Sequence, residues 1–194
     1  MEGKSASTPR TAMISGHIDI SQADFATYYI PAIDLAISRD DRFILGDAQG
    51  TDTLALNYLL QHGGPVIKHR ITIYPSRPYN VAKFEDMGIT TNTDPPEDNA
   101  VASGHFVRGK GRRDGEEART RHLQRDARMT RASGYDNLWT RSEEEARKLY
   151  GDKYRSRVSA TELNGLRRLE ALEEARKAIA EGEDVSGAKD MSGT

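Results

Sequence analysis

Short apolar runs alternate with longer stretches of helical periodicity along most of this chain. Four runs have the length and composition of strands, and they cover residues 11–15, 42–45, 66–74 and 135–140; a glycine or proline closes the first three. Helical segments follow these runs at 23–38, 52–62, 116–133, 142–150 and 161–181. Alternation of this kind is typical of a parallel sheet that helices cover on both faces. The pattern therefore predicts an α/β fold, a three-layer sandwich with a mostly parallel sheet.

Several residues mark where these helices begin, bend or end. Ser21 is a candidate N-cap, and Pro31 inside the segment 23–38 predicts a kink or a helix boundary. Gly63 is typical of a helix end, and the sequence that starts at Ser142 resembles a capping box. In the last helix we expect an inward apolar face made by Leu163, Leu166, Leu169 and Leu172.

The segment 75–115 lacks this periodicity. It holds four prolines, several glycines and a basic run at 108–113. A connection of this length is unusual in a compact domain, and we interpret it as a long loop within one domain that spans residues 11–182. The small and polar residues 1–10 and 183–194 are expected to form flexible tails.

Composition narrows the classes of function. The formal net charge of −2 provides no global field for nucleic acid or an anionic membrane. Because the chain has no cysteine, it excludes disulfide scaffolds, thiolate catalysis and cysteine-ligated metals, and its five histidines lack metal-ligand spacing. No apolar run approaches the roughly 20 residues of a membrane span, and no secretory signal is recognisable. We expect a cytoplasmic protein without a metal site, a cofactor or a membrane partner.

The strongest local signal is an apolar strand that runs into a glycine turn and then directly into a helix, Phe43-Ile-Leu-Gly-Asp-Ala-Gln-Gly-Thr-Asp. Such a turn presents backbone N–H groups, and the helix N-terminus adds partial positive charge, which together favour an anion such as phosphate. Gly46 and Gly50 would let the backbone approach a ligand closely. Thr51 or Asp52 can cap the helix and leave the other side chain to a ligand. The alternative is an ordinary strand–helix connection, since the motif is neither G-x-G-x-x-G nor a P-loop.

The two strand-end turns together resemble the SLOG superfamily, a Rossmann-like group that includes YspA-like proteins, the DNA-processing protein DprA and the LOG enzymes. The resemblance rests on Ile14-Ser-Gly-His, on the turn from Gly46, where Asp47 replaces a second glycine, and on Arg125-Asp-Ala-Arg-Met, where Asp126 replaces an asparagine. Ser159-Ala-Thr stands where the family has a Gly-Thr that opens its last helix. The matching motifs are short and cover about residues 11–170.

This resemblance implies a Rossmann-like fold whose two turns hold a nucleotide or a nucleotide-like small molecule. The ligand-binding residues that it implies are Ser15, Gly16, His17, Gly46, Gly50, Thr51, Arg125, Ser159 and Thr161. The hydrolytic LOG branch has a catalytic glutamate where this chain has Asn164, and an amide cannot replace a carboxylate in acid–base chemistry. A sensor or binding protein is therefore the first hypothesis.

Two alternatives stay open. Asp47 and Asp52 are candidate catalytic carboxylates, which keeps an N-glycosidase or a deoxyribosyltransferase-like enzyme in view. Nucleic-acid binding through the arginine-rich segment 108–131 is disfavoured because acidic residues are interleaved there. The polar second half of the last helix is either solvated or part of a homo-oligomer formed through the four leucines.

Overall fold

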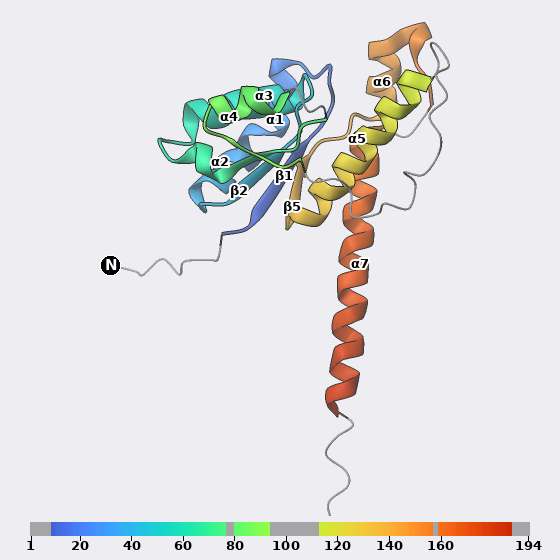
Figure 1. Ribbon diagram of the computed structural model, residues 1–194. Coiled ribbons are helices and arrows are strands. Elements are labelled where there is room, and N and C mark those ends of the chain that lie inside the picture. The colour runs from blue at the N-terminus through green and yellow to red at the C-terminus, as the bar shows by residue number, and fades with distance from the viewer. Residues whose placement is uncertain (1–8, 77–79, 94–112, 157–158, 188–194) are drawn as a thin grey trace, which may run out of the picture.

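The computed structural model describes residues 9–76, 80–93, 113–156 and 159–187 (Figure 1). The ends of the two predicted tails, the greater part of the predicted loop and the basic residues 108–112 lie outside these ranges. Within the predicted loop, residues 80–93 include a short helix and a short strand, so regular secondary structure interrupts the loop there.

A five-stranded sheet forms the centre of the fold. Its strands are β1 Thr11–Ser15, β2 Arg42–Leu45, β3 Ile71–Ile73, β4 Thr90–Thr91 and β5 Tyr135–Leu138. They lie in the order β4-β3-β2-β1-β5, and every neighbouring pair is parallel. The chain moves outward from β1 to β4 and then returns to the other side of β1. The α/β prediction is confirmed, and the sheet is wholly parallel.

Helices cover both faces of this sheet (Figure 1). One layer holds α1 Gln22–Tyr28, α2 Ile30–Ser38, α3 Thr51–His62 and α4 Val81–Asp86, and the other holds α5 Arg113–Ala132 and α7 Ala160–Gly187. α6 Glu143–Tyr150 and the short 3₁₀ helices η1 Ile67–Arg70 and η4 Gly151–Lys153 complete the described elements.

The two faces of the sheet are packed differently. Successive strand residues point to opposite faces, so Ala12 and Ile14 join the large apolar cluster under α1–α4, whereas Met13 points toward α5. Among the residues whose burial is described, the cluster on the α5 side has four buried members: Met13, Ile44, Tyr74 and Met129. Polar side chains make many of the other contacts of α5 and α7 with the sheet, and several of them belong to the candidate site.

The helix-boundary signals are largely confirmed. The Ser21 hydroxyl accepts a hydrogen bond from Asp24 N, and α1 ends before Pro31, which lies in the first turn of α2. Gly63 is the C-cap of α3, and Ser142 forms the expected capping box with Glu145.

The prediction of a strand over 66–74 is wrong in its first half. Residues 67–70 form η1, and only Ile71–Ile73 pair in the sheet. The Arg70 guanidinium donates hydrogen bonds to the carbonyls of Ala36, Ile37 and Asp41. These contacts hold a turn immediately before the strand, which an apolar sequence pattern does not encode.

The expectation of an inward leucine face on α7 is also wrong. Leu166, Leu169 and Leu172 are 51–59% exposed. The sheet-facing positions are polar instead, and Arg168 donates hydrogen bonds to Asp136 and Ser133. α7 also continues well past the edge of the sheet (Figure 1), so apolar spacing along it no longer indicates a neighbour.

Gly50→Ala should destabilise the fold by about 2 kcal/mol or more, because Gly50 combines a φ of +76° with a position where a Cβ would lie 2.4 Å from His17 O. Gly64→Ala is the matched control, since Gly64 has a φ of +79° but open space around the added Cβ, and we expect a loss of about 1 kcal/mol. Urea denaturation of both variants measures the difference, and equal losses would contradict a packing role for Gly50.

Candidate functional site

The turns that follow β1 and β2 contact each other directly at the carboxyl edge of the sheet. Thr51 donates both its backbone N–H and its hydroxyl to His17 O, each at 3.1 Å. Gly50, the N-cap of α3, makes this approach possible because any side chain there would collide with the backbone of His17 and Ile18. The N-terminus of α3 is therefore directed at the β1 turn, and the two turns form one unit.

Ser15 connects this unit to three other elements. Its hydroxyl oxygen accepts a hydrogen bond from Asn164 Nδ2 at 3.3 Å, and its carbonyl accepts one from the Tyr29 hydroxyl at 2.9 Å. The same Tyr29 hydroxyl accepts a hydrogen bond from Trp139 N at 3.0 Å. A Cβ on Gly16 would lie 2.2 Å from the Tyr29 hydroxyl, so only glycine fits over this junction.

His17 is held in a defined hydrogen-bonding state. Its Nε2 accepts a hydrogen bond from Arg141 N at 3.0 Å, which assigns the ring proton to Nδ1. Burial lowers the pKa of His17 from its usual value, and the positive charge of Arg141 lowers that pKa further. His17 therefore offers a neutral N–H donor at neutral pH.

The start of α7 lies over the end of β1. Ser159 and Glu162 form a reciprocal cap, in which Glu162 N donates to the Ser159 hydroxyl at 3.1 Å and Ser159 N donates to the Glu162 carboxylate at 2.5 Å. Thr161 and Asn164 are both buried. Sequence reasoning missed Glu162, although the spacing Ser-x-x-Glu is a capping-box signal.

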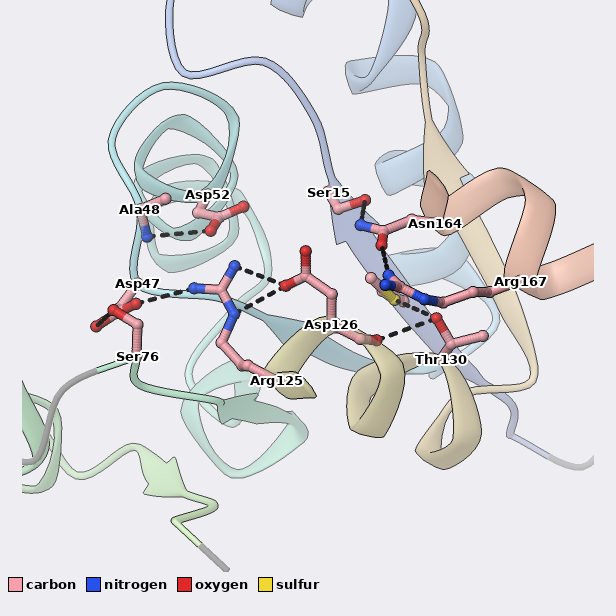
Figure 2. Close-up of polar contacts among 11 residues, drawn as sticks. Ser15, Asp47, Ala48, Asp52, Ser76, Arg125, Asp126, Thr130, Asn164 and Arg167 are labelled. Atoms are coloured by element: carbon pink, nitrogen blue, oxygen red, sulfur yellow. Dashed lines mark hydrogen bonds and ion pairs between the residues drawn. The ribbon is translucent and has the colours of Figure 1, made fainter. Parts of the chain in front are cut away.

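Asn164 occupies the position at which the hydrolytic LOG enzymes have a glutamate, according to the resemblance described above. Arg167 Nη1 donates to Asn164 Oδ1 at 2.7 Å, and this contact directs the amide nitrogen toward Ser15 (Figure 2). Asn164 thus links the first turns of α7 to β1 as a neutral hydrogen-bonding group.

A charged cluster lies beside the β2 turn, centred on Arg125 of α5 (Figure 2). Arg125 is 8% exposed; its Nη1 lies 3.0 Å from Asp47 Oδ1, and its Nη2 lies 2.7 Å from Asp126 Oδ1. Gly46 allows this guanidinium to lie against the backbone, because a Cβ there would be 2.9 Å from Arg125 Cζ and 2.5 Å from Asp52 Oδ2.

Asp47 is fully engaged in this cluster. One carboxylate oxygen pairs with Arg125, and the other accepts hydrogen bonds from Asn80 Nδ2 at 2.6 Å and from the Ser76 hydroxyl at 3.2 Å. Burial acts to raise the pKa of Asp47, but the hydrogen bonds from Asn80 and Ser76 and the charge of Arg125 outweigh it, so this pKa is lowered. Asp47 is an ionised group that positions Arg125.

Asp52 has the opposite character. Burial raises the pKa of Asp52 to about 7; Arg125 and a hydrogen bond from Ala48 N oppose this rise, and the charges of Asp126 and Asp47 reinforce it. Near neutral pH this carboxyl group is therefore partly protonated, so the cluster contains two carboxyl groups whose environments differ strongly.

Asp126 was not among the expected site residues. Its Oδ1 accepts from both Nε and Nη2 of Arg125, at 2.9 and 2.7 Å. Figure 2 shows its other oxygen pointing away from the guanidinium, and no described residue donates a hydrogen bond to that oxygen. The signal was available as the Asp in Arg125-Asp-Ala-Arg-Met, where the family pattern has an amide.

In the described part of the arginine-rich segment, Arg125 and Arg128 are turned inward, whereas Arg131 is exposed. Arg125 is committed to carboxylates, and Arg128 has its Nε and Nη1 atoms buried. Across the described ranges, no group of three or more acidic or histidine side chains has metal-site geometry, and no helix has the length and hydropathy to cross a membrane.

Comparison of the chain with protein-family models, with curated proteins and with solved structures gives no match. The SLOG resemblance therefore stays a hypothesis that rests on short motifs.

Asp52→Asn should stabilise the protein at alkaline pH. Between about pH 4 and pH 7 the folded state keeps the Asp52 proton that the unfolded chain has lost, so stability falls as pH rises and the full penalty applies above pH 7. That penalty reaches up to about 4 kcal/mol, since one pKa unit corresponds to about 1.4 kcal/mol. We expect the gain of Asp52→Asn over the native chain in urea denaturation to be larger at pH 8 than at pH 5.

The exposed Asp86→Asn is the control, and it should leave the pH dependence of unfolding unchanged. Parallel stability curves for native protein and Asp52→Asn would show that Asp52 titrates normally.

Arg125→Met should destabilise the fold by about 3–5 kcal/mol, because it leaves the buried Asp47 and Asp126 without their cation. Arg131→Met, at an exposed position on the same helix, should change stability by no more than about 0.5 kcal/mol. Thermal unfolding followed by circular dichroism compares the two, and similar melting temperatures would argue against a central role for Arg125.

Proposed function

We propose that this chain binds a nucleotide or a nucleotide-derived small molecule at the carboxyl edge of its sheet, over the turns that follow β1 and β2. The observation that carries the proposal is the convergence of these two turns with the start of α7 beside the Arg125 cluster. In open α/β sheets, ligands bind outside the carboxyl ends of the strands, where the strand order reverses. Here that reversal occurs at β1, which ends in Ser15.

The chemistry of this edge supports a small polar ligand. Ser15, the neutral His17 ring and the buried Asn164 amide gather on one side, and Asp52, Arg125 and Asp126 lie on the other. A concentration of strongly perturbed titratable groups is typical of functional sites. The ligand contacts that we propose use hydrogen-bond donors with fixed orientation, which is how small-molecule sites gain specificity.

Mass spectrometry of native protein incubated with mixed nucleoside mono-, di- and triphosphates tests the proposal. We expect an intact nucleotide to be retained and to raise the melting temperature. Ser15→Ala should weaken its binding about 2- to 12-fold, the loss expected for one hydrogen bond of about 0.5–1.5 kcal/mol. Ser38→Ala, on an exposed hydroxyl at the end of α2, is the control. Absence of retention and of any thermal shift at millimolar nucleotide would contradict the proposal.

A second candidate is cleavage of an N-glycosidic bond, and the raised pKa of Asp52 beside an ion-paired Asp126 favours it. A protonated carboxyl can donate its proton to a leaving base while an ionised carboxylate stabilises the positive charge that develops on the sugar. Water then adds to the sugar carbon and returns a proton to Asp52. In this scheme Asp47 keeps Arg125 in place and does not contact the substrate.

Base release should fall as pH rises through about 7, because the general acid must be protonated. Asp52→Asn should abolish release while the protein remains folded, and Asp86→Asn should leave the rate unchanged. Chromatography of nucleoside and nucleotide incubations measures the free base. A complete lack of free base over the whole panel would exclude this candidate and leave the binding proposal standing.

A further inference from the structure

Three rings and one guanidinium form a connected stack next to the Ser15–His17 turn. The His17 ring meets Trp139 edge-on, with a centroid distance of 5.5 Å. Tyr28, the last residue of α1, stacks on Trp139 almost in parallel, with centroids 4.3 Å apart and an interplanar angle of 5°. The Arg141 guanidinium carbon lies 5.6 Å from the Trp139 ring centroid. The partly buried Trp139 thus contacts His17, Tyr28 and Arg141, and the more exposed Tyr28 forms the outer layer of the stack.

The inner part of this stack is fixed by hydrogen bonds. Trp139 N donates to the Tyr29 hydroxyl, and Arg141 N donates to His17. Arg141 also pairs with Asp19 at 3.1 Å, and its side chain is 6% exposed. Trp139 therefore provides a rigid support behind Tyr28, which reduces the entropy lost when a ligand stacks on it.

Tyr28 differs sharply from its neighbour Tyr29. Tyr29 is fully buried and joins Ser15 to Trp139, whereas Tyr28 is 44% exposed. Within the described part of the chain, the side chain of Tyr28 has no ring contact besides Trp139 and makes no hydrogen bond. A supported tyrosine ring with an accessible side presents a flat aromatic surface beside the proposed site.

We propose that this surface, the Tyr28–Trp139 stack, is the subsite for the aromatic base of the bound nucleotide. The inference rests on the function proposed above and adds where the base is held. Every nucleobase has a flat π-face, so stacking on an aromatic side chain accepts different bases and contributes strongly to binding. The sugar and phosphate would then extend past His17 toward the Ser15 turn.

The test compares ligands with and without a base. We would measure the binding of AMP, GMP, CMP, UMP and ribose 5-phosphate to the native chain by calorimetry. We expect the best nucleotide to bind about 5- to 150-fold more tightly than ribose 5-phosphate, which is the range for one base stacked on an aromatic ring. Tyr28→Leu should remove about 5-fold or more of that advantage and leave ribose 5-phosphate binding within twofold.

Tyr154→Leu is the matched control, because the described contacts of this tyrosine are with Arg147 and Glu143 of α6 and include none of the rings of the stack. The chain has one tryptophan, so the double variant Trp139→Phe with Tyr28→Trp places a single fluorophore at the outer position. Nucleotides should quench its emission and ribose 5-phosphate should not.

The possible failures are distinct from one another. Equal affinity for nucleotides and ribose 5-phosphate, or equal losses in Tyr28→Leu and Tyr154→Leu, would overturn the base subsite but not the binding function. Binding of none of the five compounds would overturn both.

Discussion

The pairing of one buried guanidinium, that of Arg125, with nearby carboxyl groups determines how α5 is joined to the carboxyl edge of the sheet. Arg125 joins α5 to the end of β2 through Asp47 and balances Asp126 on its own helix. Loss of one member of a buried ion pair leaves the other charge buried without a partner. This costs more folding free energy than the intact pair contributes, so the residues of the Arg125 cluster depend on one another. One cation cannot balance three ionised carboxylates in a buried setting. Burial raises the pKa of Asp52 to about 7, so this carboxyl group is only partly ionised near neutral pH.

The difference between the two sheet faces follows from the same feature. The α1–α4 face buries a large apolar cluster. On the described part of the α5 and α7 face, four apolar residues form the buried cluster, and polar contacts of Arg125, Asn164 and Arg168 supply the rest. Hydrogen-bonded polar contacts specify geometry more sharply than apolar contacts but add less net stability. The apolar layer therefore supplies most of the stability, and the polar layer sets the positions of the groups at the carboxyl edge.

The sequence predicted the fold well because its signals there are local. Ser21, Pro31 and Ser142 act within one helical turn, and the strand pattern needs only short apolar runs. The sequence-based predictions fail where contacts with residues distant in the sequence, or their absence, determine the local structure. Arg70 bonds to the end of α2 and turns residues 67–70 into a 3₁₀ helix, and α7 continues past the sheet, which leaves Leu169 exposed.

The same distinction applies to the candidate site. The sequence predicted that the backbone is closely approached at Gly46 and Gly50, because glycine has no side chain to prevent such contacts. The sequence could not separate the roles of Asp47 and Asp52, because two aspartates five residues apart look alike until Arg125, Asn80 and burial act on them. The departure from the family pattern marked Asp126 in the sequence, but its place beside the β2 turn depends on which face of α5 meets β2.

Asp52 is the residue that architecture explains least. Within the described part of the chain, its carboxyl group accepts one hydrogen bond, from Ala48 N. This bond needs only an acceptor oxygen, and the amide of an asparagine would supply that oxygen without a titration penalty. A carboxyl group here makes the folded state less stable above about pH 4, because burial opposes its ionisation. Sites that sacrifice stability in this way are typical of function, since a group held far from its solution pKa is poised to bind or transfer a proton. The requirements of folding therefore do not explain the carboxyl of Asp52, whereas the function that we propose for this edge gives it a role.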